Sequence, residues 1–219
     1  KGFRKEISQK LITQAQLQKE YAKTNIPIHQ ANPNNLDGNK GFNSLPEPSA
    51  CDLYFDIESV EDHIYPGGLE YLFGIYYVED GKEQFKAFWA HSKNEEKQNV
   101  INFFEFTKAH FKKYPSSKIY HYGSYEITAL LKLTSLHKEK GIEYDQYLRL
   151  FKFVNLLNVN KQGLFLSENS FSLKNVEKFY NFTREGDVQK GDVSQEYYSE
   201  WVETQEQHYL DEIESYNKQ

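Results

Sequence analysis

The stretch LYFDIES, residues 53–59, joins an apolar run to two carboxylates, Asp56 and Glu58. Side chains of a strand alternate between its two faces, so the two acids are predicted to share one face and Leu53 and Phe55 the other. The rise of a strand would place the acids about 7 Å apart. Like charges at this distance repel each other and resist burial, so the pair requires either a bound cation or open exposure to solvent.

Composition narrows the classes of function. The chain has 219 residues and a formal net charge of −6, which argues against a broad basic surface that binds nucleic acid by charge alone, although a phosphate could still be held through metal ions. The single cysteine, Cys51, excludes an intramolecular disulfide and indicates a reducing compartment. No apolar run approaches the roughly 20 residues of a membrane span, and no signal peptide is present, so we expect a cytoplasmic protein with no membrane partner.

Two parts are expected along the chain. Residues 5–23 are rich in helix formers, and four of the six prolines fall between residues 27 and 48, among Asn and Gly. Residues 1–50 are therefore predicted to be a helix and linker from a preceding domain, and residues 51–219 to be the globular domain. The chain starts without methionine and stops inside a predicted helix, so we expect a fragment of a longer protein, truncated at its C-terminus.

The order of elements indicates an α/β fold. A meander of three strands is followed by a helix, a fourth strand and a second helix, which is typical of a mixed sheet flanked by helices. Residues 151–157 are compatible with a fifth strand or with a helix. Capping boxes are predicted at Ser92/Glu95 and at Thr204/Gln207. The predicted strands cover residues 52–57, 68–80, 82–91 and 118–122, and the predicted helices cover residues 92–114, 124–137, 172–180 and the segment from 194 onward.

Two further motifs carry candidate site residues. In IYHYGSYEITALL, residues 119–131, a strand leads directly into a helix whose first turn contains Glu126. This acid either interacts with the helix dipole or supplies a third metal ligand, whereas His121 is expected to be a strand residue and not a ligand. In EIESYNKQ, residues 212–219, Tyr216 is either a core tyrosine or a site residue.

Together these motifs resemble those of the DEDD 3′–5′ exonuclease superfamily: D-x-E on a first strand, an acid after the fourth strand, and Y-x-x-x-D on a late helix. The tyrosine is typical of the DEDDy branch. The chain is most similar to the ribonuclease H-like domain of RecB-like nuclease–helicase fusion proteins, through QAQLQKEYAKTNIPI, LPEPSACDLYFDIES, GGLEYLFGIYYVEDG, FWAH, IYHYGSYE, FSLKNVEKFY and SYNKQ.

The resemblance implies a ribonuclease H-like α/β fold with a mixed five-stranded sheet, in which LYFDIES is central. It implies that Asp56, Glu58 and Glu126 are catalytic acids that bind two divalent cations, Mg²⁺ or Mn²⁺. Tyr216 would be a fourth catalytic residue that orients the attacking water, and the last aspartate would be residue 220. Glu126 stands where most of these enzymes have Asp, and Asn155 stands where an acid is common and is assigned no catalytic role.

The leading hypothesis is a metal-dependent 3′–5′ exonuclease domain that hydrolyses single-stranded DNA or RNA. It would belong to a larger, bacterial nuclease–helicase, with RecB-type nuclease and helicase domains of the same parent chain as partners. Without the fourth acid this fragment would be feeble or inactive. The alternative is a catalytically weak nucleic-acid-handling or scaffolding domain, which the net charge and Glu126 favour. A third hypothesis, a protein-interaction module that uses surface tyrosines, has no specific support.

Overall fold

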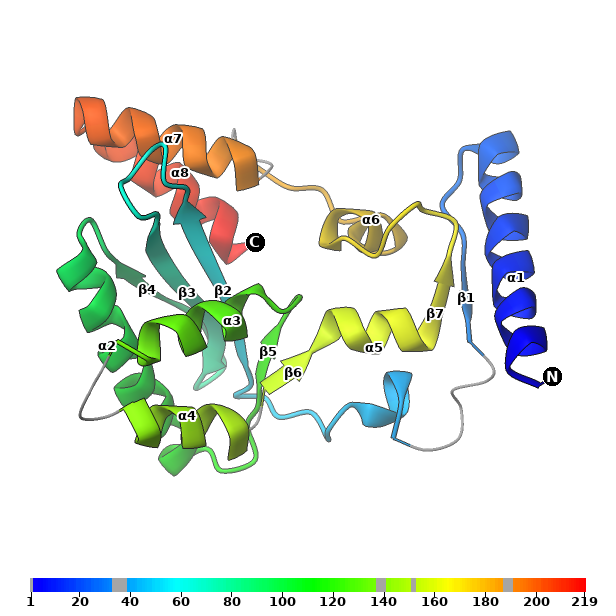
Figure 1. The fold of residues 1–219 in the computed structure, drawn as a ribbon, viewed down its shortest axis with the longest axis horizontal. Coiled ribbons are helices and arrows are strands. Elements are labelled where there is room, and N and C mark those ends of the chain that lie inside the picture. The colour runs from blue at the N-terminus through cyan, green and yellow to red at the C-terminus, as the bar shows by residue number, and fades with distance from the viewer. Residues whose placement is uncertain (1, 33–38, 137–140, 151–152, 187–190) are drawn as a thin grey trace. The chain divides into compact units, whose positions relative to one another are not determined.

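The computed structural model of the chain describes residues 2–32, 39–136, 141–150, 153–186 and 191–219 (Figure 1). The chain forms two compact units. One contains residues 47–154 and 184–219, and the other contains residues 1–46 and 155–183. Both units are therefore assembled from segments that are distant in sequence.

A mixed five-stranded sheet forms the centre of the first unit, in the order β4-β3-β2-β5-β6. Strand β2 pairs antiparallel with β3 and parallel with β5, and β3 pairs antiparallel with β4. LYFDIES lies in the central strand, as predicted. The strands are β2 (Leu53–Val60), β3 (Leu69–Glu79), β4 (Lys82–Trp89), β5 (Ile119–His121) and β6 (Phe153–Asn155).

Helices pack on both faces of this sheet. The larger core cluster joins Phe55 and Ile57 of β2 to Phe103 of α2, Leu130 of α3 and Tyr144 of α4. The helices are α2 (Lys93–Lys113), α3 (Tyr125–Thr134) and α4 (Gly141–Leu150). Because the apolar positions of β2 alternate, these helices cover the face that carries no acids.

The opposite face of β2 is covered in part by α7 (Gly191–Thr204) and α8 (Gln207–Lys218). Leu210 and Ile213 of α8 pack against Leu72 and Val60. The register of β2 and β3 shifts between Glu58 and Ser59, which is a β-bulge. Pairing continues beyond the bulge through Ser59 with Glu70 and Val60 with Leu69, and Val60 and Leu69 belong to the core cluster formed with α7 and α8.

Two helix starts differ from the prediction. Ser92 Oγ accepts the Glu95 N–H at 3.3 Å, as predicted, but the Glu95 carboxylate accepts the His91 N–H at 2.6 Å instead of closing the box on Ser92. The Thr204/Gln207 capping box was a wrong prediction. Thr204 is the last residue of α7, and its hydroxyl donates to the Glu200 carbonyl at 2.8 Å. The same oxygen accepts the Glu206 N–H at 3.3 Å, and Glu206, the N-cap residue of α8, makes no side-chain cap hydrogen bond.

The second unit contains a two-stranded sheet that was not predicted. Strand β1 (His29–Ala31) lies within the predicted linker and pairs antiparallel with β7 (Leu164–Leu166). Residues 155–183 therefore cluster with residues 1–46, although they fall inside the range predicted for the globular domain. The remaining elements are α1 (Gly2–Thr24), η2 (Gly41–Ser44), α5 (Leu156–Gly163), α6 (Leu173–Glu177) and η3 (Lys178–Tyr180). Across the described residues, no helix combines the length and apolar character needed to cross a membrane.

Candidate active site

The three predicted acids come from strand β2 and from helix α3, which follows the neighbouring strand β5. Asp56 and Glu58 lie on β2. The parallel pairing of β2 with β5 places the end of β5 beside Asp56, and the chain then turns through Gly123, whose φ is +123°, into α3. A positive φ of this kind favours glycine, which has no Cβ to oppose it. Glu126 in the first turn of α3 is thereby brought to the carboxyl group of Asp56.

Asn217 of α8 bridges the two acids of β2. Its Nδ2 donates to Asp56 Oδ2 at 3.0 Å and to Glu58 Oε1 at 3.3 Å. Asn217 lies four residues after Ile213, so it continues the buried stripe of α8 toward the sheet. The bridge also confirms that Asp56 and Glu58 point to the same face of β2.

Gly74 makes room for this bridge. It is the partner of Asp56 across the β2–β3 pair. A Cβ at residue 74 would overlap Asn217 Oδ1 and would come within 2.9 Å of the Phe85 ring. Oδ1 is itself buried and has no hydrogen-bond partner among the described residues. Glycine at residue 74 thus allows the amide to reach the acids, and it leaves one amide oxygen unsatisfied.

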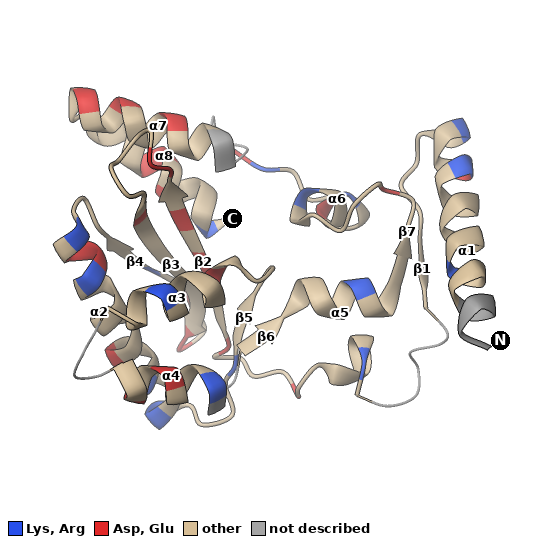
Figure 2. Cartoon of the chain, viewed as in Figure 1, with Lys and Arg blue, Asp and Glu red and all other residues tan. Residues whose placement is uncertain are grey.

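Burial and neighbouring charges set the pKa values of the two acids on β2. Burial raises the pKa of Asp56 well above its usual value, and the negative charges of Glu58 and Glu126 raise it further. Although protein surrounds the Asp56 carboxylate on most sides, its side chain still reaches solvent. Burial also raises the pKa of Glu58 to about 7, against the lowering effects of hydrogen bonds from Asn217 and Ser194 and of the Arg184 charge. Figure 2 shows that acidic residues also line α7 and α8.

His121 and Glu126 form a second buried contact. His121 Nδ1 and Glu126 Oε2 are 3.3 Å apart, and both side chains are almost fully buried. His121 is the last residue of β5, as expected of a strand residue. It orients Glu126, a role that the sequence did not indicate.

Tyr216 lies apart from the buried stripe of α8. Its side chain is half-buried, and the Arg184 guanidinium lies 4.9 Å from the centre of its ring. Tyr216 therefore does not belong to the apolar core cluster of Ile213. Arg184 also acts electrostatically on Glu58, so the residue that contacts Tyr216 lies near the acids.

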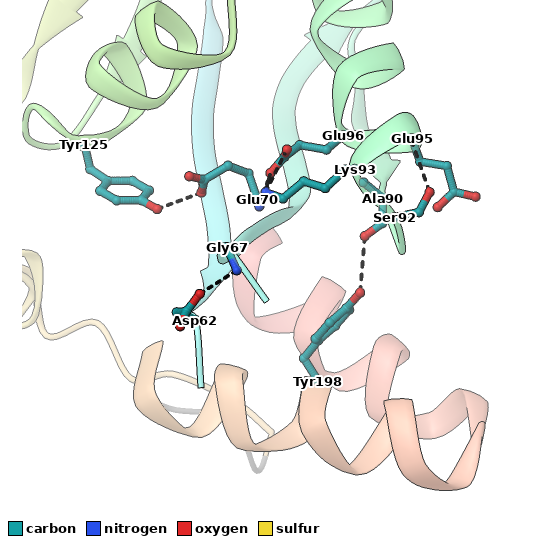
Figure 3. A network of polar contacts seen from close by, with 10 residues as sticks. All are labelled: Asp62, Gly67, Glu70, Ala90, Ser92, Lys93, Glu95, Glu96, Tyr125 and Tyr198. Atoms are coloured by element: carbon teal, nitrogen blue, oxygen red, sulfur yellow. Dashed lines mark hydrogen bonds and ion pairs between the residues drawn. The ribbon is translucent and has the colours of Figure 1, made fainter. Parts of the chain in front are cut away.

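A polar network fixes the start of α3 (Figure 3). The Tyr125 hydroxyl lies 2.7 Å from both Glu70 Oε2 of β3 and Ser59 Oγ of β2. The Glu70 N–H donates to the buried Glu96 carboxylate at 2.8 Å, and Lys93 forms an ion pair with Glu96 at 3.0 Å. Since Tyr125 directly precedes Glu126, this network ties the third acid to the strands that carry or adjoin the other two.

The donor set suits a hard divalent cation, because carboxylate oxygens are the preferred ligands of Mg²⁺ and Mn²⁺. Within the described ranges, however, no three His, Cys, Asp or Glu side chains are grouped closely enough to hold a metal ion. The reason lies in the hydrogen bonds: the Asn217 amide stands between Asp56 and Glu58, and Glu126 is turned to His121. The residues fit a cation by their chemistry, and their side chains would have to rotate to enclose it.

Comparison with known families identifies the fold. The RNase H superfamily model RNase_H_2 matches residues 53–219, which span the central strand, the start of α3 and the whole of α8. The chain belongs to the RNase H superfamily. Searches of curated proteins and of solved structures returned no match. For this RNase H superfamily domain, membership points to nuclease chemistry on nucleic acid in general.

The sequence missed three residues of the site: Gly74, Arg184 and Asn217. Gly74 carried a usable signal, because a glycine inside an apolar strand often marks the close approach of another group. Asn217 follows from helical spacing after Ile213, but Tyr216 drew attention as the more distinctive residue. Arg184 lies in a segment with no periodic pattern, so nothing in the sequence pointed to it.

Proposed function

We propose that this domain is a metal-dependent 3′–5′ exonuclease of the DEDDy type, acting on single-stranded nucleic acid within a larger nuclease–helicase. The observation that carries the proposal is that the Asp56 carboxyl lies close to both Glu58 and Glu126 in an RNase H superfamily fold. The chemistry that bound Mg²⁺ or Mn²⁺ would supply is the activation of a water and the stabilisation of the leaving oxygen.

The chain's own residues divide this work. Asp56 is the acid with access to solvent, so it faces the incoming phosphate and the attacking water. Glu58 and Glu126 are buried and held by Asn217 and His121, so they are the fixed ligands. Fixed positions favour catalysis because no reorganisation is needed during the reaction.

Tyr216 and Arg184 supply the remaining polar groups. We assign the Tyr216 hydroxyl to the orientation of the attacking water. The Arg184 guanidinium offsets negative charge beside Glu58, and we assign it to the phosphate of a substrate. The Arg184 side chain would supply local positive charge in a chain whose net charge is −6.

An exposed tyrosine near the acids favours a single-stranded substrate. Tyr54 lies two residues before Asp56 on the same face of β2 and is 49% exposed. It pairs in register with Tyr76 on β3 and with Tyr120 on β5, and its ring stacks on that of Tyr120 at 5.5 Å. Unpaired bases stack on such aromatic surfaces, whereas bases inside a duplex cannot.

The test is cleavage of an end-labelled single strand in the presence of Mn²⁺. We expect shortening from the 3′ end by the wild-type domain, joined to its parent chain, and a loss of at least about 100-fold in rate for Asp56→Asn. A duplex with blunt ends is the control substrate. Cleavage that survives Asp56→Asn would overturn the assignment of this site.

A second candidate is a scaffolding domain that handles nucleic acid without cleaving it. It is favoured by the Asn217 amide, which stands between two of the acids, and by the many acidic residues of α7 and α8. If this candidate holds, single strands would bind in the presence of EDTA with unchanged affinity, and no cleavage would follow on addition of Mn²⁺.

A further inference from the structure

Asn217 bridges Asp56 and Glu58, and its NH₂ group reduces the repulsion between them. Its amide group donates to Asp56 Oδ2 at 3.0 Å and to Glu58 Oε1 at 3.3 Å. Two carboxylates that face each other accept hydrogen bonds and cannot donate them when ionised. The NH₂ group is therefore oriented by the acids, and it reduces their repulsion in the same direction as a cation would.

The other end of the same amide is unsatisfied. Asn217 Oδ1 is buried against Gly74 and has no hydrogen-bond partner among the described residues. Rotation of the amide by about 180° about χ2 exchanges its oxygen and nitrogen without moving the helix. After that rotation Oδ1 would face Asp56 and Glu58, where it would find a partner if a cation lay between them or if one of the two carboxyl groups were protonated.

We propose that Asn217 is a component of the cation site: its NH₂ group bridges Asp56 and Glu58 in the cation-free protein, and its Oδ1 becomes a neutral oxygen ligand when a divalent cation enters. Amide oxygens are ordinary ligands of hard cations. This inference rests on the proposed function, because it requires that the acids bind a cation.

Gly74 is the second part of the arrangement. Any Cβ at residue 74 would meet the buried end of the amide, whichever atom occupies it. The space above Gly74 is therefore shaped to a side chain of the size of asparagine. Replacement by aspartate preserves that size and adds a charge, while replacement by alanine removes both donor and ligand.

The experiment measures cation binding by calorimetry with Mn²⁺ for the 219-residue protein and four variants. Asn217→Ala should weaken Mn²⁺ binding by about 10-fold, in the range found when groups around a metal site are removed. Asn217→Asp should strengthen it by at least a few-fold, because a carboxylate replaces a neutral ligand. Gln207→Ala, on the exposed first turn of the same helix, is the matched control and should bind like the wild type. Glu58→Gln reports on the acids themselves.

A second readout follows the amide directly. In the wild-type protein the side-chain NH₂ resonances of Asn217, assigned by their absence in Asn217→Asp, should shift during titration with diamagnetic Mg²⁺ while those of exposed amides stay constant. This measurement needs no variant to fold beyond the one used for assignment.

The outcomes separate the two proposals. If Glu58→Gln weakens Mn²⁺ binding but Asn217→Ala leaves it unchanged or makes it tighter, Asn217 is no ligand and this inference is overturned while the acid site stands. If the wild type and Glu58→Gln behave alike, or neither binds Mn²⁺, the proposed cation site falls together with the inference. Weaker binding in both variants, with a shifted Asn217 resonance, supports both.

Discussion

At the scale of single residues, the ionised acids of β2 destabilise the fold, and without a cation the fold offsets this only in part. Asp56 and Glu58 both have raised pKa values, and Asn217 supplies the hydrogen bonds that hold them side by side. A group whose pKa is higher in the folded protein binds protons more strongly there, so folding is favoured while it is protonated. Stability should therefore depend on pH at this site.

The raised pKa of Glu58 defines the pH range over which stability should change. Its value rises from 4.5 to about 7 in the fold. Its contribution to stability is fully present below pH 4.5 and is lost as the pH rises through about 7, a change of roughly 2–3 kcal/mol. In EDTA, Glu58→Gln should therefore gain stability relative to the wild type as the pH is raised from 5 to 8, measured by urea unfolding. Glu200→Gln on α7 is the control, and a difference between Glu58→Gln and the wild type that stays constant over that range would contradict the prediction.

Gly74→Ala should destabilise the fold by about 1–3 kcal/mol, because the added methyl group forces neighbouring atoms apart in a packed site. The atoms concerned are Asn217 Oδ1 and the Phe85 ring. The double variant with Asn217→Ala tests the partner. If Asn217 is the main obstacle, the two substitutions should cost less together than the sum of their separate effects. Strict additivity would assign the overlap to Phe85 alone.

At the scale of elements, the sequence predicted those with a strong repeating pattern. The alternation in LYFDIES and the stripe of Val100, Phe103 and Phe104 each report one buried face, and both elements formed as expected. The helix over residues 141–150 and the strand over 164–166 were not predicted. Strand β7 is three residues long and depends on its pairing with β1, some 130 residues earlier. A strand this short, paired with a distant segment, has no local sequence pattern that would predict it.

The two predicted helix caps should now differ in a measurable way. Ser92→Ala should cost about 1 kcal/mol, since Ser92 Oγ accepts the Glu95 N–H at the start of α2. Thr204→Ala should cost less, because Thr204 ends α7 and bonds back to the carbonyl of its own helix. Chemical denaturation of the two variants in parallel checks this order. If Thr204→Ala lowered the free energy of unfolding by about 1 kcal/mol or more, as Ser92→Ala does, Thr204 would have to be accepted as a cap of α8.

The start of α3 depends on Tyr125. Tyr125→Phe removes the hydroxyl shared with Ser59 and Glu70, and a hydrogen bond to a charged group contributes about 1.5–3 kcal/mol. We expect a loss of stability in that range, together with weaker Mn²⁺ binding, because Glu126 is the next residue. Tyr180→Phe, at a site that is 76% exposed, is the matched control and should change neither quantity. Unchanged Mn²⁺ binding in Tyr125→Phe would show that α3 is held by its apolar face alone.

At the scale of the whole molecule, the mixed five-stranded sheet was predicted, while the clustering of a later segment with the N-terminal residues was not. The prediction placed the boundary near residue 50, but residues 155–183 also cluster with residues 1–46. No change in composition marks residues 155 or 183, so no sequence pattern indicated a segment that leaves one unit and returns. The same limit hid Asn217, whose contact with Asp56 joins residues 161 positions apart.

Deletion of residues 1–46 should leave the five-stranded sheet folded. Those residues pair and pack with residues 155–183, through β1 with β7 and η2 with α5. Hydrogen exchange should therefore show unchanged protection of the amides of β2 and lost protection of the amides of β7. Loss of protection in β2 would mean that the sheet needs the N-terminal segment to fold.

The distance along the chain between Asp56 and Asn217 also has a consequence for synthesis. A ribosome adds residues in order, so β2 with its acids is complete long before α8 leaves the exit tunnel. During that interval Asp56 and Glu58 lack the amide that bridges them, and the acid-bearing face of the sheet lacks its covering helix. The acid-bearing face therefore becomes covered only after α8 has left the tunnel.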